Sequence, residues 1–558
     1  MPLIKSFLRT SNVLGMLASS GHTLTTMFRP LLVCSLGLAA LGASAQSVAW
    51  IHAYENTFSW ATSMARGGEG ELYLGGRIRD LGDPFDGLPL VGYGYQDGFI
   101  AKTDGTGHAA WIHLIGAASS EYVVDVQERD GELTIAGNMV NSGSGSSINY
   151  NGGAYEIPYE CCSNGYIMRL DTAGTLQWLF QPDGSPTDMH IDDAGDIHLV
   201  TLGDSMRYYR LSATGNGLME FAFSDFSFSP QLAMAPDGDI LIASAFSQTH
   251  WWAGATYTTH GNGDILLSRF DASGVLQFTK HIGSVGNDMV NDLHMGSDGA
   301  LRMSGVLNGV VDYGGDTLAG AATRWFLATI DGTGDLLTLN DSTFSTRGAT
   351  GQITENDAGE TLVTINFTDT LIRGSDTLIS LVDGGGYEAG GVIAKWNSTG
   401  QLSWYRALSV DTTDLIGHMS IRFGPLAADS IFICGLINEP VIVEGTLYNL
   451  PHDNIAYAGL LIDTTYAPIA LGTAAAATGP AHPLLVVPNP STSTALLQGV
   501  LPGDRVDVMD ALGRCVLSAR VATLGLRLDA TTLPDGAYSI RVRNEGEGTR
   551  IARWAVVR

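Results

Sequence analysis

Short runs in which apolar and polar residues alternate recur along residues 50–466, and glycine and acidic residues bound each run. Alternation with a period of two predicts β-strands that bury one face. The Asp-Gly and Asp-x-x-Gly steps between the runs predict tight turns. Because no long helical pattern interrupts the series, we expect this part of the chain to consist of antiparallel β-structure.

Two sequence elements recur seven times in this region. The first joins an acidic or glycine-containing turn to an alternating strand, at 68–76, 129–137, 193–201, 236–244, 297–305, 357–365 and 427–435. The second is a strand that runs into another turn, at 97–107, 164–174, 206–215, 263–274, 324–334, 391–400 and 458–466. With an aromatic-led strand opening most units, each unit holds four strands. Seven four-stranded units predict an all-β fold, a seven-bladed β-propeller.

The units resemble the β-propeller repeats of large secreted bacterial proteins. The shared pattern is D-x-x-G-[DNE]-[IL] followed by an alternating strand, as in "PDGDILIAS" at 236–244 and "DAGDIHLVT" at 193–201. The resemblance covers residues 50–466. It implies a propeller scaffold over 46–466 and no defined activity.

The chain changes character after residue 466. Residues 467–482 are rich in alanine, glycine and proline and are expected to form a linker. Residues 483–558 return to short alternating strands with turns such as "LPDG" at 533–536. This segment predicts a small, immunoglobulin-like β-sandwich.

Several motifs of residues 483–558 resemble the type A C-terminal sorting domain of the type IX secretion system. The residues that carry the resemblance are Pro488, Asn489, Pro490, Gly513, Arg514, Leu533, Pro534, Gly536 and Tyr538. The resemblance implies that the secretion machinery exports the chain across the outer membrane and that a sortase-like peptidase removes the domain. The product is then released or linked to surface lipopolysaccharide. Met509 stands where the family commonly has an aromatic residue.

The N-terminal 45 residues contain the pattern of a secretory signal peptide. A start at Met27 is followed by Arg29, an apolar run and the small residues of 43–45, which predicts cleavage between Ala45 and Gln46. Residues 1–26 are then an upstream extension. The apolar run is too short to span a membrane, and no other run approaches that length. We therefore expect Sec export through the periplasm to the medium or the outer cell surface.

The net charge of −28 narrows the choice of partner. Binding of nucleic acid requires a basic face, so a nucleic-acid partner is not expected. Four cysteines follow the signal peptide, too few for a disulfide framework in a chain of this length. Cys161 and Cys162 form a vicinal pair that is either locally oxidised or two unrelated thiols, and Cys434 is expected to be buried in a strand.

The repeats contain acidic turns that need separate examination as calcium ligands. Asp192, Asp193 and Asp196 lie close together in "IDDAGDI", yet calcium takes about six oxygen ligands and no EF-hand spacing is present. Turn formation explains these residues and their counterparts in other units, because aspartate accepts backbone N–H groups and glycine takes positive φ. We expect no cofactor, with calcium at this turn as a minor alternative.

Aromatic residues in the variable loops suggest a binding surface. Trp251, Trp252 and Tyr257 lie in "THWWAGATYTTH", and aromatic rings on exposed loops suit sugars or peptides. The competing and favoured interpretation is that these rings fill the space between blades.

Motif searches reveal no hydrolase, phosphate-binding or zinc-protease signature. The leading hypothesis is therefore a non-enzymatic binding or adhesion scaffold whose ligand is an extracellular glycan or protein. The alternatives are a secreted hydrolase or lyase with carboxylates at the propeller mouth, and a structural adhesin component.

Overall fold

The computed structural model describes residues 46–463 and 485–556 apart from gaps, the longest being 141–146, 157–163, 341–348, 380–389 and 410–418. The described residues contain β-strands and no α-helix, which confirms the predicted all-β class. The predicted cleavage residue Ala45, Met27, the linker and the Cys161–Cys162 pair lie outside the described residues. The same holds for both predicted domain boundaries around the linker.

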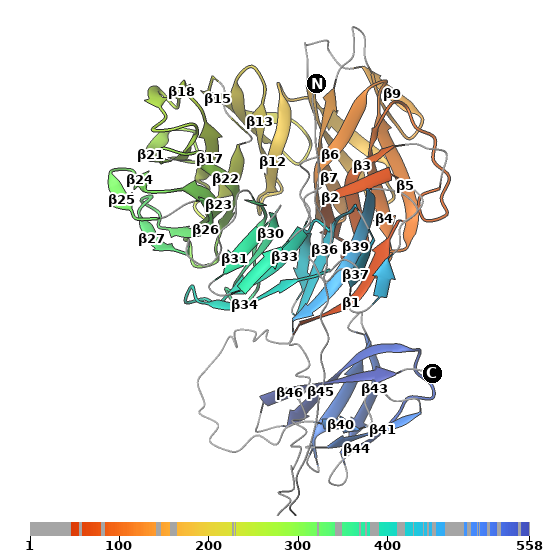
Figure 1. Cartoon of the computed structure of the whole chain (residues 1–558). Coiled ribbons are helices and arrows are strands. Elements are labelled where there is room, and N and C mark those ends of the chain that lie inside the picture. The colour runs from red at the N-terminus through yellow and green to blue at the C-terminus, as the bar shows by residue number, and fades with distance from the viewer. Residues whose placement is uncertain are drawn as a thin grey trace, which may run out of the picture. The chain divides into compact units, whose positions relative to one another are not determined.

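Residues 46–463 form seven antiparallel sheets built on four strands each, a β-propeller (Figure 1). Sheet 1 contains β2 (Phe58–Arg66), β3 (Leu72–Arg79), β4 (Asp97–Thr103) and β5 (Ala109–Gly116). Sheet 2 contains β6 (Ser120–Arg129), β7 (Glu132–Val140), β10 (Asn164–Asp171) and β11 (Leu176–Phe180). Sheet 3 contains β12 (Ser185–Ile191), β13 (Ile197–Leu202), β14 (Met206–Leu211) and β15 (Gly217–Ser224). Each sheet takes its first three strands from one predicted unit and its fourth, aromatic-led strand from the next, so the sheets are offset by one strand from the predicted units.

The remaining four sheets follow the same order. Sheets 4 and 5 contain β16 (Gln231–Met234), β17 (Ile240–Phe246), β20 (Asp264–Phe270) and β21 (Leu276–Gly283); β22 (Met289–Met295), β23 (Leu301–Asn308), β26 (Thr323–Ile330) and β27 (Leu336–Leu339). Sheets 6 and 7 contain β28 (Ala349–Thr350), β29 (Ile353–Glu355), β30 (Thr361–Phe367), β33 (Gly390–Trp396) and β34 (Leu402–Ala407); β35 (Arg422–Ala427), β36 (Ser430–Ile437), β39 (Ile455–Asp463) and β1 (Gln46–Ala53).

Strand β1 closes the propeller by pairing with the last strand of the repeat region. It lies antiparallel to β39, with Gln46 opposite Asp463. The two ends of residues 46–463 are thereby joined in sheet 7, and the outer edge of that sheet comes from the start of the chain. Closure leaves no sheet of the propeller without a neighbour on each side.

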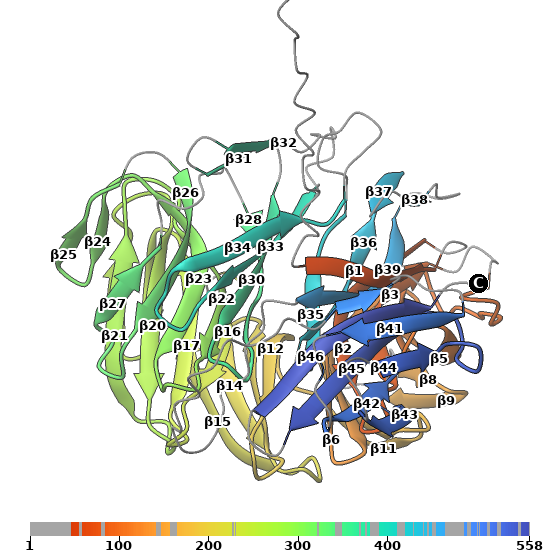
Figure 2. The same ribbon diagram turned by 90° about the horizontal axis from the view of Figure 1, so that it is seen from below.

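Each pair of consecutive sheets shares its own hydrophobic cluster, including the pair formed by sheets 7 and 1. Between sheets 5 and 6, for example, the buried rings of Trp325 and Trp396 stack with centroids 5.6 Å apart. In sheets 3 to 5 the first strands, β12, β16 and β22, lie toward the middle of the propeller and the fourth strands, β15, β21 and β27, toward its outside (Figure 2). Stability therefore comes from contacts between neighbours around the ring.

Hairpins in the variable loops extend the neighbouring sheets. The hairpins β8 (Ser147–Tyr150) with β9 (Gly153–Glu156), β18 (Thr249–Trp252) with β19 (Ala255–Thr258), and β24 (Val311–Tyr313) with β25 (Asp316–Leu318) each pair with the fourth strand of the preceding sheet. Two further hairpins form separate pairs, β31 (Thr370–Arg373) with β32 (Asp376–Ile379) and β37 (Val441–Val443) with β38 (Thr446–Tyr448). These loops therefore join neighbouring sheets.

The recurring Asp-x-x-Gly turns have the predicted chemistry. Asp271 accepts backbone N–H bonds from Ser273 and Val275 at 2.9 and 3.0 Å, and Gly274 has φ of 82°. A side chain on Gly274 would meet the ring of Phe221, which belongs to the preceding sheet, at 3.1 Å. Both the positive φ and the close approach of an aromatic ring require glycine there, so this turn is a packing joint between sheets.

Residues 485–556 form two further antiparallel sheets. One contains β40 (Leu485–Val487), β41 (Thr494–Gln498) and β44 (Leu526–Asp529), and the other contains β43 (Cys515–Arg520), β42 (Arg505–Met509), β45 (Gly536–Asn544) and β46 (Gly548–Val556). Both sheets contribute to one buried cluster that includes Leu528, Tyr538 and Trp554. This arrangement is a β-structure with its own core, and its immunoglobulin-like class stays a prediction.

Candidate functional site

Seven equivalent positions on the first strands carry the polar side chains that we call the inner polar ring. In four sheets the position directly follows a register shift of the strand, in sheet 7 it begins the strand and in sheet 6 it lies between β28 and β29. It holds a polar residue in all seven sheets. The members are Ser63, Asp125, Asp188, Gln231, Asp292, Gln352 and Arg422. All except Ser63 keep part of their surface exposed.

Two carboxylates of the ring, those of Asp188 and Asp292, connect neighbouring sheets in the same way. Asp188 accepts the N–H of Met189 on its own strand through Oδ1 and the N–H of Leu232 in the next sheet through Oδ2, both at 2.8 Å. Asp292 likewise accepts from Leu293 at 2.8 Å and from Ile353 in the next sheet at 2.6 Å. Each carboxylate therefore ties two sheets together through backbone groups.

Asp125 is held by side chains as well as by its own backbone. Its Oδ1 accepts from the Ser63 hydroxyl at 2.6 Å and from the Val126 N–H at 2.8 Å, and its Oδ2 accepts from the Gln127 amide at 2.8 Å. Gln127 in turn donates to the carbonyl of Met189 in the next sheet at 2.7 Å. Both oxygens of all three ring carboxylates are therefore engaged.

Burial raises the pKa of each of these carboxyl groups. The pKa of Asp188 is raised well above its usual range by burial and next by the charge of Asp292. Burial raises the pKa of Asp292 to about 7, against the lowering effect of two backbone N–H bonds and of Arg422. Burial also raises the pKa of Asp125 despite its three hydrogen bonds. The carboxylates keep some exposed surface, so the direction of the shifts reflects the surrounding protein atoms.

Two histidines follow the ring carboxylates of sheets 3 and 5 by two residues. Burial lowers the pKa of His190 to about 4, and burial lowers the pKa of His294 as well. Both imidazoles are consequently neutral at pH 7. The acids whose charges act on them lie outside the ring, Asp192 and Asp193 for His190 and Glu355 for His294. The ring is built to join sheets, and its acids are poorly placed as general bases.

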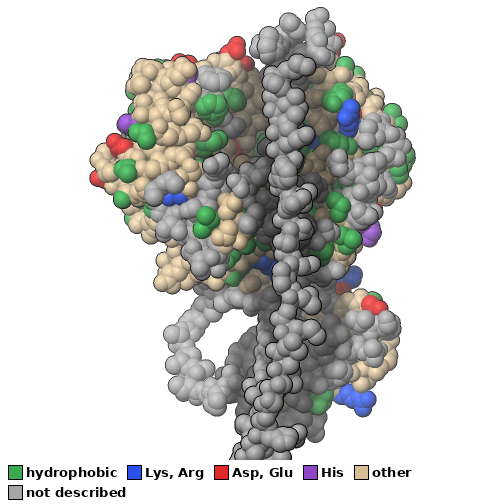
Figure 3. Space-filling model, viewed as in Figure 1, with side chains coloured by type: hydrophobic (Ala, Val, Ile, Leu, Met, Phe, Trp, Pro, Cys, Tyr) green, Lys and Arg blue, Asp and Glu red, His purple; other side chains and the backbone are tan. Residues whose placement is uncertain are grey.

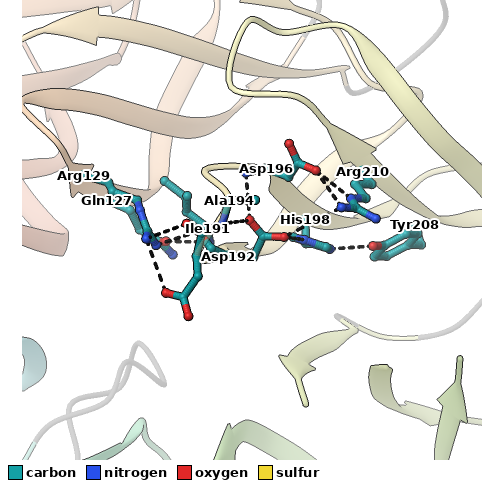
Figure 4. A network of polar contacts seen from close by, with 10 residues as sticks. Gln127, Arg129, Ile191, Asp192, Ala194, Asp196, His198, Tyr208 and Arg210 are labelled. Atoms are coloured by element: carbon teal, nitrogen blue, oxygen red, sulfur yellow. Dashed lines mark hydrogen bonds and ion pairs between the residues drawn. The ribbon is translucent and has the colours of Figure 1, made fainter. Parts of the chain in front are cut away.

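The carboxylates of the acidic turn at 192–196 accept hydrogen bonds from the backbone of the turn and pair with histidine and arginine side chains (Figure 4). Asp192 accepts the N–H groups of Ala194 and Asp196 at 2.9 Å, and its other oxygen lies 3.1 Å from His198 Nε2. Asp196 accepts from Arg210 at 2.9 Å. Asp193 is exposed beside Arg129, 3.3 Å away. Protein donors occupy the oxygens that a calcium ion would need.

The aromatic loop is divided between the core and the surface. Trp252 is 1% exposed and its indole N–H donates to the Ser268 hydroxyl at 2.7 Å. Trp251 is 38% exposed, and Tyr257 packs partly buried against the same hydrophobic cluster. The three rings do not form one exposed surface, because the β18–β19 hairpin turns alternate residues inward where it extends sheet 3. Only Trp251 is freely presented.

The described residues of the sorting motif have structural partners in the C-terminal region. Leu533 and Tyr538 belong to the buried cluster, and the Tyr538 hydroxyl donates to the Pro534 carbonyl at 2.7 Å. Arg514 is exposed and pairs with Asp510 at 2.8 Å. Gly536 begins β45. Pro488, Asn489, Pro490 and Gly513 lie outside the described residues.

Sequence reasoning missed the inner polar ring. Its members are spread over seven repeats and differ in type, so no motif announces them. Aligning the units on their acidic turns places six of the seven residues in one column and Asp125 one position away from it, and that alignment is the signal that could have found them. The charged side chains on the face drawn in Figure 3 are scattered and do not gather in one patch.

No protein-family model and no curated protein matches the chain. Among solved structures it is similar to the Dos1 propeller, with 11% identity over 74% of this chain and 95% of that chain and a TM-score of 0.38. It is also similar to BamB from Moraxella catarrhalis, with 12% identity over 72% of this chain and 85% of that chain and a TM-score of 0.33. A third similar structure is PorZ, a surface component of the type IX secretion system of Porphyromonas gingivalis, with 11% identity over 89% of this chain and 81% of that chain and a TM-score of 0.25. TM-scores this low carry no argument about function.

Among the described residues, no helix has the length and apolarity needed to cross a membrane.

Proposed function

We propose that the protein is an exported, non-enzymatic binding scaffold, a β-propeller that the type IX secretion system delivers to the medium or the cell surface. The observation that carries the non-enzymatic part is the engagement of both oxygens of Asp125, Asp188 and Asp292. A carboxylate that already accepts two or more hydrogen bonds from its scaffold is a poor base for a substrate proton. The hydrolase alternative needs such a base at the middle of the propeller.

Delivery is supported by the two ends of the chain. The signal-peptide pattern of residues 27–45 favours entry into the periplasm. The C-terminal motifs favour recognition by the secretion machinery and removal by its sortase-like peptidase. Gln46, the first residue after the predicted cleavage point, begins β1, so cleavage there leaves the strand that closes the propeller intact. Attachment to lipopolysaccharide is one of the two outcomes of this route.

Export can be tested with a matched pair of exposed arginines in the C-terminal region. Arg514 belongs to the sorting motif, whereas Arg527 lies outside it and makes one long contact with Thr494 at 3.4 Å. R514A is expected to accumulate in the periplasm of the producing bacterium, while R527A is exported and its C-terminal fragment removed. Intact-mass measurement of periplasm and medium gives the result. Equal export of both variants would reject a sorting role for Arg514.

Binding can be separated from catalysis with the mature full-length chain. Glycan and protein arrays are expected to give a saturable ligand, and a hydrolase and lyase panel no turnover. If turnover appears and D188N or D292N abolishes it while the chain stays folded, the hydrolase alternative replaces our proposal. A chain that has neither ligand nor activity and that assembles into filaments would favour the structural adhesin.

A further inference from the structure

Two joints between neighbouring sheets are built on the same plan, and we call them joint 1 and joint 2. Joint 1 connects sheets 1 and 2 through a parallel bridge between Gln96 and Ser120, and joint 2 connects sheets 4 and 5 through a parallel bridge between Gly263 and Asn287. Each joint contains a buried aspartate at the start of the third strand, Asp97 or Asp264.

The backbone contacts of the two joints correspond one to one. Asp97 accepts the N–H of Tyr93, four residues earlier, at 2.9 Å, and Asp264 accepts the N–H of His260 at 2.8 Å. A side chain on Gly116 would collide with Asp97, and one on Gly283 with Asp264. Both carboxylates therefore close the same loop against the same glycine.

A second acid completes each joint from the following sheet. Glu121 accepts the N–H of Ala117 at 2.8 Å, and Asp288 accepts the N–H of Ser284 at 2.6 Å, in each case four residues earlier. The structural task of the acids is thus the same in both joints.

The joints differ at two corresponding sequence positions. Joint 1 has Tyr93 and, opposite Phe99 in the strand register, Leu114; joint 2 has His260 and, opposite Leu266, His281. Joint 1 shows that the loop closes without histidine. The two imidazoles of joint 2 are therefore additions to a structural element that is complete without them.

The additions bring three metal-ligand atoms together. His260 Nδ1 lies 2.9 Å and His281 Nε2 lies 2.6 Å from Asp264 Oδ2, and the three ligand atoms all lie within 4.8 Å of one another. The two imidazole rings are stacked at 4.5 Å. Three ligand atoms this close together can share one zinc ion, which binds imidazole nitrogen and carboxylate oxygen at about 2 Å.

Two further observations point to an occupant. Asp264 is fully buried, and its Oδ1 has no hydrogen-bond partner among the described residues, so this oxygen is available to a cation. The other nitrogen of His260, Nε2, lies 4.0 Å from Asp312 Oδ2. A carboxylate that hydrogen-bonds the far side of an imidazole fixes which nitrogen is free to bind metal, and Asp312 must move about 1 Å closer to make that bond.

We propose that His260, Asp264 and His281 form a binding site for a divalent transition-metal cation, with zinc as the best fit. Imidazole and carboxylate ligands suit zinc, and three protein ligands leave one coordination position open. His260 is 43% exposed, so solvent or an added ligand can reach that position. Asp312 acts as a positioning residue for His260.

A second group, His52, Asp86 and His108, has a similar composition and serves as the internal control. His52 Nε2 lies 3.0 Å and His108 Nδ1 lies 3.6 Å from the oxygens of Asp86. His108 is 64% exposed, and Asp86 Oδ2 already accepts the N–H of Ala109 at 2.7 Å. Its carboxylate thus has a structural partner on the oxygen nearest His108.

The test is zinc titration of the mature full-length chain by calorimetry, with cobalt absorption as a spectroscopic readout of imidazole coordination. The variant H260Y/H281L installs the side chains of joint 1 and so keeps a combination that the fold already accepts. It is expected to bind zinc about 100-fold more weakly, and D312N about tenfold more weakly, as loss of a ligand or of its supporting partner does. H108A is expected to bind at joint 2 as the unmodified chain does.

Three outcomes overturn the proposal: no zinc binding by the unmodified chain, unchanged affinity in H260Y/H281L, or loss of affinity in H108A equal to that in H260Y/H281L. In the first case joint 2 is an aspartate–histidine hydrogen-bond network without a cation. Circular dichroism and unfolding curves of H260Y/H281L show whether weaker binding reflects a lost site or a misfolded chain. Should that variant misfold, H281Q, which keeps a polar side chain, replaces it and must lose the cobalt spectrum.

Discussion

Joint 1 and joint 2 perform the same structural task with different chemistry around one aspartate. In joint 1 Asp97 accepts the backbone N–H of Tyr93, whereas in joint 2 two imidazoles also approach Asp264 within hydrogen-bonding distance. The repeat supplies an unchanged frame of acid, glycine and backbone amide. We expect function where one copy of the joint differs from the other, because a residue that the shared structure does not require can serve in binding.

The charges of the two joints differ accordingly. In joint 1 burial raises the pKa of Glu121 to about 7, and the nearby charge of Asp97 adds to the effect. In joint 2 hydrogen bonds from His281 and from the His260 backbone and side chain lower the pKa of Asp264 against the raising effect of burial. Joint 1 therefore favours the protonated form of Glu121, whereas joint 2 favours the ionised form of Asp264.

The largest expected effect tests whether the two aspartates share a structural role. D97A and D264A, compared in the presence of chelator, are each expected to lower the free energy of unfolding by about 2 to 3 kcal/mol. The reason is that a backbone N–H loses its charged acceptor inside the protein. Urea unfolding measures both values. A loss at one joint alone would break the structural equivalence on which the comparison rests.

The second prediction concerns pH and joint 1. The pKa of Glu121 is about 7 in the folded protein against about 4.3 in an unfolded chain, so the folded state binds this proton more tightly. Its contribution to stability is complete below about pH 4 and is lost as the pH rises toward 7. E121Q is expected to be more stable than the unmodified chain by about 2 kcal/mol at pH 8 and equal to it near pH 4. Parallel pH profiles of thermal unfolding for the two proteins would contradict this.

The third prediction transfers the chemistry of joint 2 to joint 1. Y93H/L114H introduces two imidazoles at the positions of joint 1 that correspond to His260 and His281, and it is expected to create a second zinc site. The zinc affinity of joint 1 is expected to rise by at least tenfold over that of the unmodified chain, or about 1.4 kcal/mol. Leu114 is 7% exposed, so the substitution also costs about 1 to 3 kcal/mol of stability by burying a polar ring. Calorimetric stoichiometry reports the gain. Unchanged stoichiometry in a folded variant would mean that two histidines and an aspartate in this frame do not suffice.

The smallest effect separates joint 2 from the neighbouring aromatic loop. Trp251 is 38% exposed on the hairpin that also carries Tyr257, whose ring lies edge-on to His281 at 5.9 Å. W251A is expected to change the free energy of unfolding by less than about 0.5 kcal/mol and to leave zinc affinity unchanged. Loss of glycan or peptide binding in W251A with intact zinc binding would assign two separate sites. Loss of both glycan or peptide binding and zinc binding in W251A would indicate one shared site.

Much of the fold was predictable because it is written in local pattern. The turn at Asp271 and Gly274 shows why: one carboxylate and one glycine fix the turn within five residues, and the same solution recurs in the other repeats. Alternation set the strands, and the number of copies implied a closed arrangement. The burial of Trp252 was an open question in the sequence, since alternation in a four-residue strand does not say which face meets the neighbouring sheet.

The candidate sites were beyond sequence reasoning for a different reason. Asp188 and Leu232 are 44 residues apart, and Asp292 and Ile353 are 61 apart, so their contacts depend on how successive sheets pack. His260 and His281 belong to a loop and a strand whose register brings them to one aspartate. Each was visible in the sequence only as a scattered histidine.

The sequence by itself determined the all-β class, the repeated pattern and the turn chemistry, because these follow from interactions between residues close in the chain. It also contained every side chain of the two joints, without showing that they meet. The tertiary structure alone decided which side chains from different sheets meet. That decision rests on strand register and on the closure of β1 against β39, which are set by packing around the whole ring. Inner polar ring, joint and hairpin all arise at those contacts between sheets.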